Sequence, residues 1–224
     1  MNQQCVQTGG ATSVNVNERI GAVYDELVTK IERDPTIQAM LDGTLTREVY
    51  VRWLQQSYHY VRWTSVWLDQ AVPRATTLAV REALTTKARE ESGHEQWILR
   101  DLVSLGVDIS TRGNWPICPG VAAYIAWLCF EVEKGQAEAI LGAAFILERL
   151  SEHYAQRAAK RMTGAGFRRD ALLFMAAHGE ADVGHTLELM KVLDGIEDEE
   201  VARTIELAAW MTAKAYLNLL ESVR

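Results

Sequence analysis

Residues 174–193 read FMAAHGEADVGHTLELMKVL, a helical pattern that is apolar at both ends and polar at its centre. Each residue of an α-helix advances by about 100°, so His178, Asp182 and His185 lie on one face. Two imidazoles and a carboxylate on a buried face suit iron or another first-row metal, whereas an unpaired buried carboxylate would be costly. A hydrogen-bonded polar cluster in the core is the alternative interpretation.

Two other helical segments carry acidic or histidine side chains within their apolar stripes. One stripe contains Glu91 and His94, three residues apart, while Glu90 lies on a more polar stripe and is the reserve ligand. On another helix, Glu148 interrupts an apolar stripe, where it needs a cation or a proton. The predicted metal ligands and catalytic residues are therefore Glu91, His94, Glu148, His178, Asp182 and His185. Six donors shared by two metal ions leave positions open for dioxygen and substrate.

Nearly the whole chain from residue 17 onward follows the helical period, with interruptions at glycine and proline. We expect seven main helices and one short one, over residues 17–33, 36–41, 46–71, 77–105, 120–134, 136–162, 167–193 and 199–223. Thr44 or Thr46 is the expected N-cap of the third helix. Long amphipathic helices joined by short loops predict an all-α, up-and-down bundle, a fold that builds metal sites from inward-facing residues of several helices.

The composition favours one domain with no nucleic-acid or membrane partner. The chain has 224 residues, 48% of them hydrophobic, enough for one core over residues 15–224, and residues 1–14 are expected to form a mobile tail. The net charge of −7 comes without a lysine or arginine cluster, which argues against binding to nucleic acid or anionic membranes. The start has no apolar leader, and the three cysteines lack zinc-site spacing, so we expect a cytoplasmic protein.

The predicted ligand set resembles that of the haem-oxygenase-like di-iron oxidases and oxygenases, an iron-containing redox group related to TenA and PqqC. The resemblance rests on His178-x-x-x-Asp182-x-x-His185, on Glu148, and on the segments LQQSYHYV (54–61) and EESGHE (90–95). It covers most of the chain and implies a single-domain haem-oxygenase-like fold, two ferrous ions per chain, and dioxygen as co-substrate. In some members the first carboxylate lies two turns before the helix histidine, a position that Lys87 occupies here.

The resemblance also implies an activity. Members of the group oxidise fatty acids or amino acids in biosynthesis, by cleaving carbon–carbon bonds, oxygenating nitrogen, or forming alkenes or nitriles. We therefore expect a small organic molecule as substrate. The sequence does not select one of these reactions, and a homodimer is one candidate assembly.

Aromatic side chains on two of the predicted helices are candidates for the substrate pocket, although most such residues form core. An apolar, aromatic-lined pocket would suit a fatty acyl chain or a hydrophobic amino acid, and Arg62 could bind a carboxylate through two hydrogen bonds. The candidate pocket residues are Tyr58, His59, Arg62, Trp63, Tyr124 and Trp127.

Three other functions compete with the di-iron interpretation. A TenA-like hydrolase would use Cys129 as its nucleophile, although a cysteine in an apolar helix is more often a core residue. A cofactor-free PqqC-like oxidase would be active without metal. A non-enzymatic metal-binding bundle would bind metal without consuming dioxygen.

Overall fold

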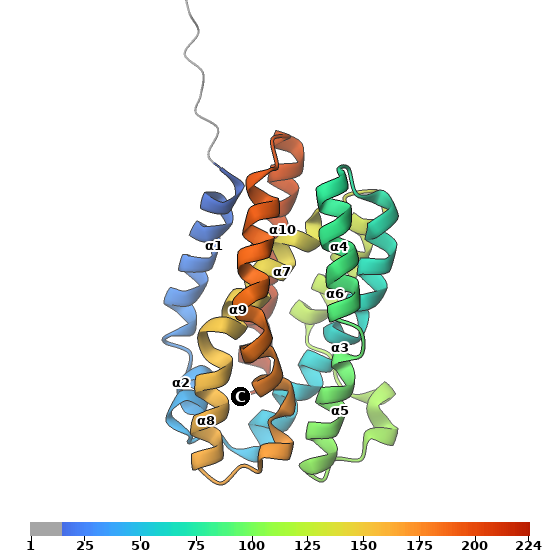
Figure 1. Cartoon of the computed structure of the whole chain (residues 1–224). Helices are drawn as coiled ribbons and strands as arrows, with labels where there is room; N and C mark the ends of the chain where they lie inside the picture. Colours follow the sequence, from blue (N-terminus) through green and yellow to red (C-terminus); the bar gives the residue numbers. More distant parts are fainter. Residues whose placement is uncertain (1–14) are drawn as a thin grey trace, which may run out of the picture.

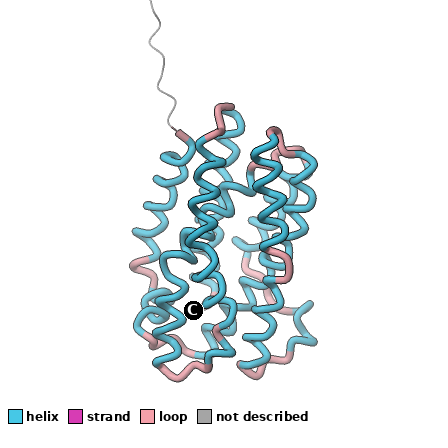
Figure 2. The backbone as a smooth tube through the Cα atoms, viewed as in Figure 1, coloured by secondary structure: helices cyan, strands magenta, loops and turns pink. Residues whose placement is uncertain are grey.

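The computed structural model describes residues 15–224, with the backbone alone for residues 180–183. Within that range it contains ten α-helices and no strand (Figures 1 and 2). The helices are α1 (Val16–Ile31), α2 (Pro35–Asp42), α3 (Arg47–Ala71), α4 (Leu78–Glu90), α5 (His94–Ser104), α6 (Pro119–Glu133), α7 (Ala139–Leu150), α8 (Gln156–Gly164), α9 (Leu173–Asp194) and α10 (Glu199–Ser222). The predicted N-terminal tail, residues 1–14, lies outside the described residues.

The long helices run side by side in an elongated bundle (Figure 1). On one side α10 packs against α7, α1 and α6, and on the other α3 packs against α4, α5 and α6. Helix α9 contacts members of both groups, namely α7 and α1 as well as α5 and α4. A side chain on the inward face of α9 therefore meets side chains from both halves of the bundle.

Several helix starts follow directly from local sequence. The side chain of Thr46, one of the two predicted caps, accepts a hydrogen bond from the Val49 amide at the start of α3. Asp34 caps α2 in the same way, with Pro35 at the first helical position. Since such caps are encoded by neighbouring residues, these helix boundaries are the ones that sequence predicts best.

The predicted all-α bundle is confirmed, but three of the predicted long helices are wrong in detail. The helix expected over 77–105 is interrupted between α4 and α5, because Gly93 adopts a left-handed conformation with φ of 87°. The helix expected over 136–162 contains a π-helical segment, Ser151–Ala155, between α7 and α8. The helix expected from 167 begins only at Leu173, after a short 3₁₀ turn. The first two differences each divide one expected helix into two, so the eight expected helices become ten.

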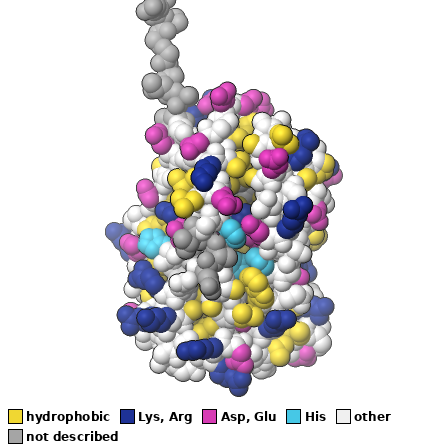
Figure 3. Space-filling model, viewed as in Figure 1, with side chains coloured by type: hydrophobic (Ala, Val, Ile, Leu, Met, Phe, Trp, Pro, Cys, Tyr) yellow, Lys and Arg dark blue, Asp and Glu magenta, His cyan; other side chains and the backbone are white. Residues whose placement is uncertain are grey.

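On the face shown in Figure 3, acidic and basic side chains are interspersed, and histidines lie near the centre and on the left. No helix in the described part of the chain is long and apolar enough to cross a membrane.

Candidate metal centre

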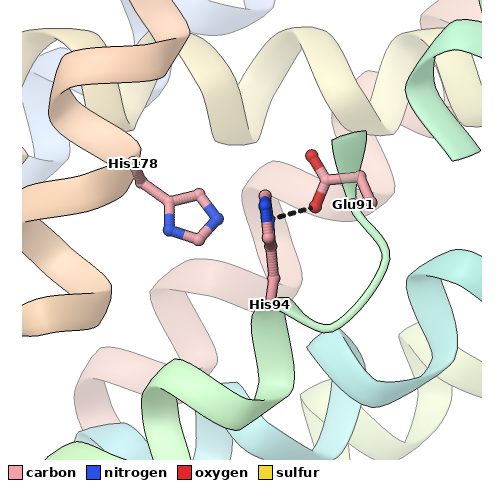
Figure 4. A group of neighbouring side chains, drawn as sticks. All are labelled: Glu91, His94 and His178. Carbon is pink, nitrogen blue, oxygen red and sulfur yellow. Dashed lines mark ion pairs between the residues drawn. The ribbon is translucent and has the colours of Figure 1, made fainter. Parts of the chain in front are cut away.

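The interruption between α4 and α5 brings the first two candidate ligands together. Glu91 follows the last residue of α4, and His94 begins α5, so the two side chains project from either side of a tight turn at Gly93. His94 Nδ1 lies 3.0 Å from Glu91 Oε2 (Figure 4). The pair expected from helical spacing therefore forms, but through a turn instead of a continuous helix.

His178 on α9 completes a compact group of three donors. Its ring lies edge-on to the ring of His94, with 4.7 Å between centroids (Figure 4). Donor atoms of Glu91, His94 and His178 all lie within 4.8 Å of one another. His178 Nδ1 is 2.9 Å from the Phe174 carbonyl oxygen, a contact that fixes the orientation of the imidazole ring.

The relative position of α5 and α9 is fixed by a buried aspartate. Asp101 on α5 accepts hydrogen bonds from the backbone amides of Leu173 (2.8 Å) and Phe174 (3.0 Å), the first residues of α9. Burial raises the pKa of Asp101 to about 6, although these two donors favour its charged form. Asp101 thus holds the helix that carries His94 against the helix that carries His178.

The three donors suit a divalent first-row metal. Burial by itself would raise the pKa of Glu91, but the hydrogen bond and charge of His94, with the charges of His178 and Lys87, outweigh it and lower that pKa. The Glu91 side chain is therefore anionic at neutral pH. Trp97 stacks on the ring of His94 with 4.1 Å between centroids and supplies an apolar wall. Imidazole and carboxylate donors suit several first-row metals, iron among them.

A second polar group lies around Lys87 on α4. The Lys87 ammonium forms an ion pair with Glu148 on α7 and lies 3.3 Å from Glu90 Oε2. Burial alone would lower the pKa of Lys87, but Glu148, Glu91 and Glu90 raise it above its ordinary value. His185 Nε2, on α9, lies 3.4 Å from Glu90 Oε1. This second group thus contains two of the predicted ligands and the reserve ligand.

The structure consequently divides the six predicted ligands. Glu91, His94 and His178 lie together, whereas Glu148 and His185 contact Lys87 and Glu90, respectively. The side chain of Asp182 lies outside the described residues. Helical periodicity does not predict this division, because Lys87 enters the sequence prediction only as the residue at a position that holds a carboxylate in some relatives.

Replacing Glu91 with alanine is expected to lower the affinity for the first ferrous ion at least about tenfold more than the same replacement of Glu90 does. Glu91 lies beside both histidines of the compact group, whereas Glu90 faces Lys87 and His185. Anaerobic calorimetric titration of both variants measures the difference. The reverse order would place Glu90 in the primary site.

Glu91 and His178 of this compact group line a cavity of about 150 Å³ with a mainly apolar wall. Polar residues at the wall include Lys87, Glu91, Glu148 and His178. Its aromatic residues are Trp53, Tyr60, Trp67, Tyr124, Tyr154, Phe174 and Tyr216. Residues of both polar groups therefore face a cavity that can hold an apolar molecule.

Of the six predicted pocket residues, Tyr124 lines this cavity and the others do not; these are Tyr58, His59, Arg62, Trp63 and Trp127. Tyr58 packs edge-on against Trp115, with 5.4 Å between ring centroids. Arg62 lies over the rings of Tyr58 and Trp63, so its charge is not directed into the cavity.

The face of α3 that lines this cavity differs from the face that carries the predicted pocket residues. The cavity-lining face carries Trp53, Tyr60 and Trp67, which recur every seven residues. Residues seven apart lie nearly above one another on a helix, so this spacing was the available signal. Tyr154 and Tyr216 come from the π-helical segment and α10, and only the tertiary structure brings them to the cavity.

Comparison with known proteins agrees with the fold. A domain of unknown function with a haem-oxygenase-like fold from Shewanella denitrificans is 20% identical, with 93% of this chain and 90% of that chain covered and a TM-score of 0.78. A TenA homologue from Pseudomonas syringae is 12% identical, with coverages of 99% and 98% and a TM-score of 0.80. Haem oxygenase-1 from Synechocystis, in complex with haem, is 12% identical, with coverages of 94% and 91% and a TM-score of 0.64. These similarities show a haem-oxygenase-like and TenA-like fold.

The sequence itself identifies the family. No curated protein matches the chain significantly. The model of a family described as iron-containing redox enzymes matches residues 51–217, a span that includes all the predicted ligands. The chain belongs to this iron-containing redox enzyme family, whose haem-oxygenase-like fold it adopts.

Proposed function

We propose that this protein is a dioxygen-dependent, non-haem di-iron oxidoreductase that acts on a small, largely apolar organic molecule. The observation that carries the proposal is the group Glu91, His94 and His178, of which Glu91 and His178 also line an apolar cavity. Ferrous iron bound there would supply electrons for the reduction of dioxygen. The second ion would use Glu148, His185 and Asp182, the three remaining predicted ligands.

The protein's own residues contribute binding, orientation and exclusion of water. Glu91, His94 and His178 would hold the first ion, and the contact of His178 with the Phe174 carbonyl would fix its ring. Trp97 and Phe174 pack on the two imidazoles, which limits access of water to the donors. A dry site favours productive oxidation of the bound substrate over loss of oxidising equivalents to solvent.

The size of the cavity bears on the substrate. A cavity of about 150 Å³ holds a molecule of roughly benzene size. A hydrophobic amino acid or a short acyl chain therefore fits the observed space better than a long fatty acid. The Tyr154 hydroxyl, which has no hydrogen-bond partner among the described residues, is available to a polar group of the substrate.

The test is an anaerobic ferrous titration of the metal-free protein, followed by rapid mixing with dioxygen and a panel of amino acids and short to long fatty acids. We expect more than one iron equivalent per chain and consumption of dioxygen that one substrate class accelerates. Absence of iron binding would contradict the proposal. Iron binding without dioxygen consumption would favour a metal-binding bundle, and turnover in the metal-free protein would favour a cofactor-free oxidase.

The TenA-like alternative depends on Cys129, which lies on α6. Its sulfur is 2.9 Å from the indole nitrogen of Trp67, and the side chain is half-buried but does not line the cavity. We therefore expect Cys129→Ser to retain wild-type turnover in the dioxygen assay within about twofold. Complete loss of activity in a correctly folded Cys129→Ser protein would instead support a nucleophilic cysteine.

A further inference from the structure

Lys87 lies where the internal cavity meets a second, outer groove. The groove has a volume of about 300 Å³ and runs between α4, α7 and α9. Lys87 lines both spaces, together with Ile140 and Ala144. The groove also carries ionisable side chains, namely Glu82, Glu90, His185 and Glu188. Lys87 therefore lies between the apolar cavity on one side and the acidic outer groove on the other.

The ammonium of Lys87 lies among donors predicted for the second metal ion. It forms an ion pair with Glu148, whose side chain is only 6% exposed, and it lies 3.3 Å from Glu90. The side chain of Lys87 is itself 14% exposed, so this charge is largely removed from water. A buried cation at this place satisfies Glu148 and repels any dication that approaches the same carboxylate.

We infer that Lys87 acts as an internal cation in place of the second metal ion and thereby sets how many ions the protein holds. This inference rests on the proposed function. A first divalent ion binds at Glu91, His94 and His178 without disturbing the ion pair. A second ion binds Glu148 only when the Lys87 ammonium leaves it, so the second equivalent binds more weakly than the first.

The structure also provides a position for the displaced ammonium. Glu90 lies one helical turn after Lys87 and lines the outer groove, so the flexible lysine side chain can remain paired as it moves away from Glu148. The ligand class is a divalent first-row cation, because the donors around Lys87 are carboxylates and the His185 imidazole.

The test is an anaerobic calorimetric and optical titration with Co(II), a spectroscopic substitute for ferrous iron, on the full chain. The variant Lys87→Gln removes the charge but retains a hydrogen-bond donor for Glu148, and Lys87→Arg retains the charge. The matched control Arg89→Gln removes one positive charge from an exposed position on the same helix. Thermal unfolding of each metal-free protein provides a readout that is independent of metal loading.

We expect the wild-type protein to bind one Co(II) ion tightly and a second ion at least about tenfold more weakly. In Lys87→Gln the dissociation constant of the second Co(II) ion should fall at least about tenfold, while that of the first ion stays unchanged. Both Lys87→Arg and Arg89→Gln should bind Co(II) as the wild type does. The metal-free Lys87→Gln protein should also melt at a lower temperature, because Glu148 loses its cation, and Co(II) should reverse that loss.

Different results would overturn different claims. Two equally tight equivalents in the wild type, or a second equivalent unaffected by Lys87→Gln, would refute the role of Lys87 and leave the proposed function intact. Failure of wild type and Lys87→Gln alike to bind even a first equivalent would refute the proposed function and, with it, this inference.

Discussion

Replacing His178 with alanine is expected to abolish tight binding of ferrous iron and to reduce dioxygen-dependent turnover at least about a hundredfold. Changes to residues that only orient a metal ligand already cost about 10- to 100-fold, and His178 is itself a proposed ligand. His94→Ala should have the same effect, because the two imidazoles and Glu91 form one compact group. Metal content by mass spectrometry and dioxygen uptake measure the two losses.

The matched control is His153→Ala. His153 is exposed, and its Nδ1 lies 3.2 Å from the Tyr24 hydroxyl, outside the cavity wall. This variant should retain iron and turnover. Stoichiometric iron together with wild-type turnover in both His94→Ala and His178→Ala would show that the metal lies elsewhere.

Replacing Gly142 with alanine is expected to lower the free energy of unfolding by about 3 kcal/mol. A Cβ atom at this position of α7 would lie 2.1 Å from the Ile205 carbonyl oxygen and 3.0 Å from the Ala209 nitrogen, both in the backbone of α10. The two helices must therefore move apart, which disrupts the most extensive helix packing in the bundle. Thermal unfolding should show a decrease in Tm of roughly 6–12 °C for a chain of this length.

Gly21→Ala provides the comparison. Gly21 lies within α1, and a Cβ atom there would meet nothing within 4 Å. Because alanine favours helix over glycine, this change should raise the free energy of unfolding by about 0.5–1 kcal/mol. If Gly142→Ala were as stable as Gly21→Ala, the close approach of α7 and α10 would be wrong.

Local sequence is sufficient to predict those helix starts that depend on a cap formed by neighbouring residues. The caps at Asp34 and Thr46 depend on side chains and amides two or three residues apart, so their helix starts can be predicted directly. The interruption at Gly93 was harder to predict. A glycine inside a helical pattern is compatible with a continuous helix, and packing of the segments on either side decides whether it adopts a positive φ.

The sequence by itself determined the all-α bundle, the nature of the donors and the helices that carry them, because helical periodicity and residue chemistry are local properties. Tertiary structure alone decided that Glu91, His94 and His178 meet, that Lys87 pairs with Glu148, and which face of α3 lines the cavity. These features depend on the positions of helices far apart in the sequence. Such positions follow from the packing of whole helix surfaces, which the periodicity of any one segment does not specify.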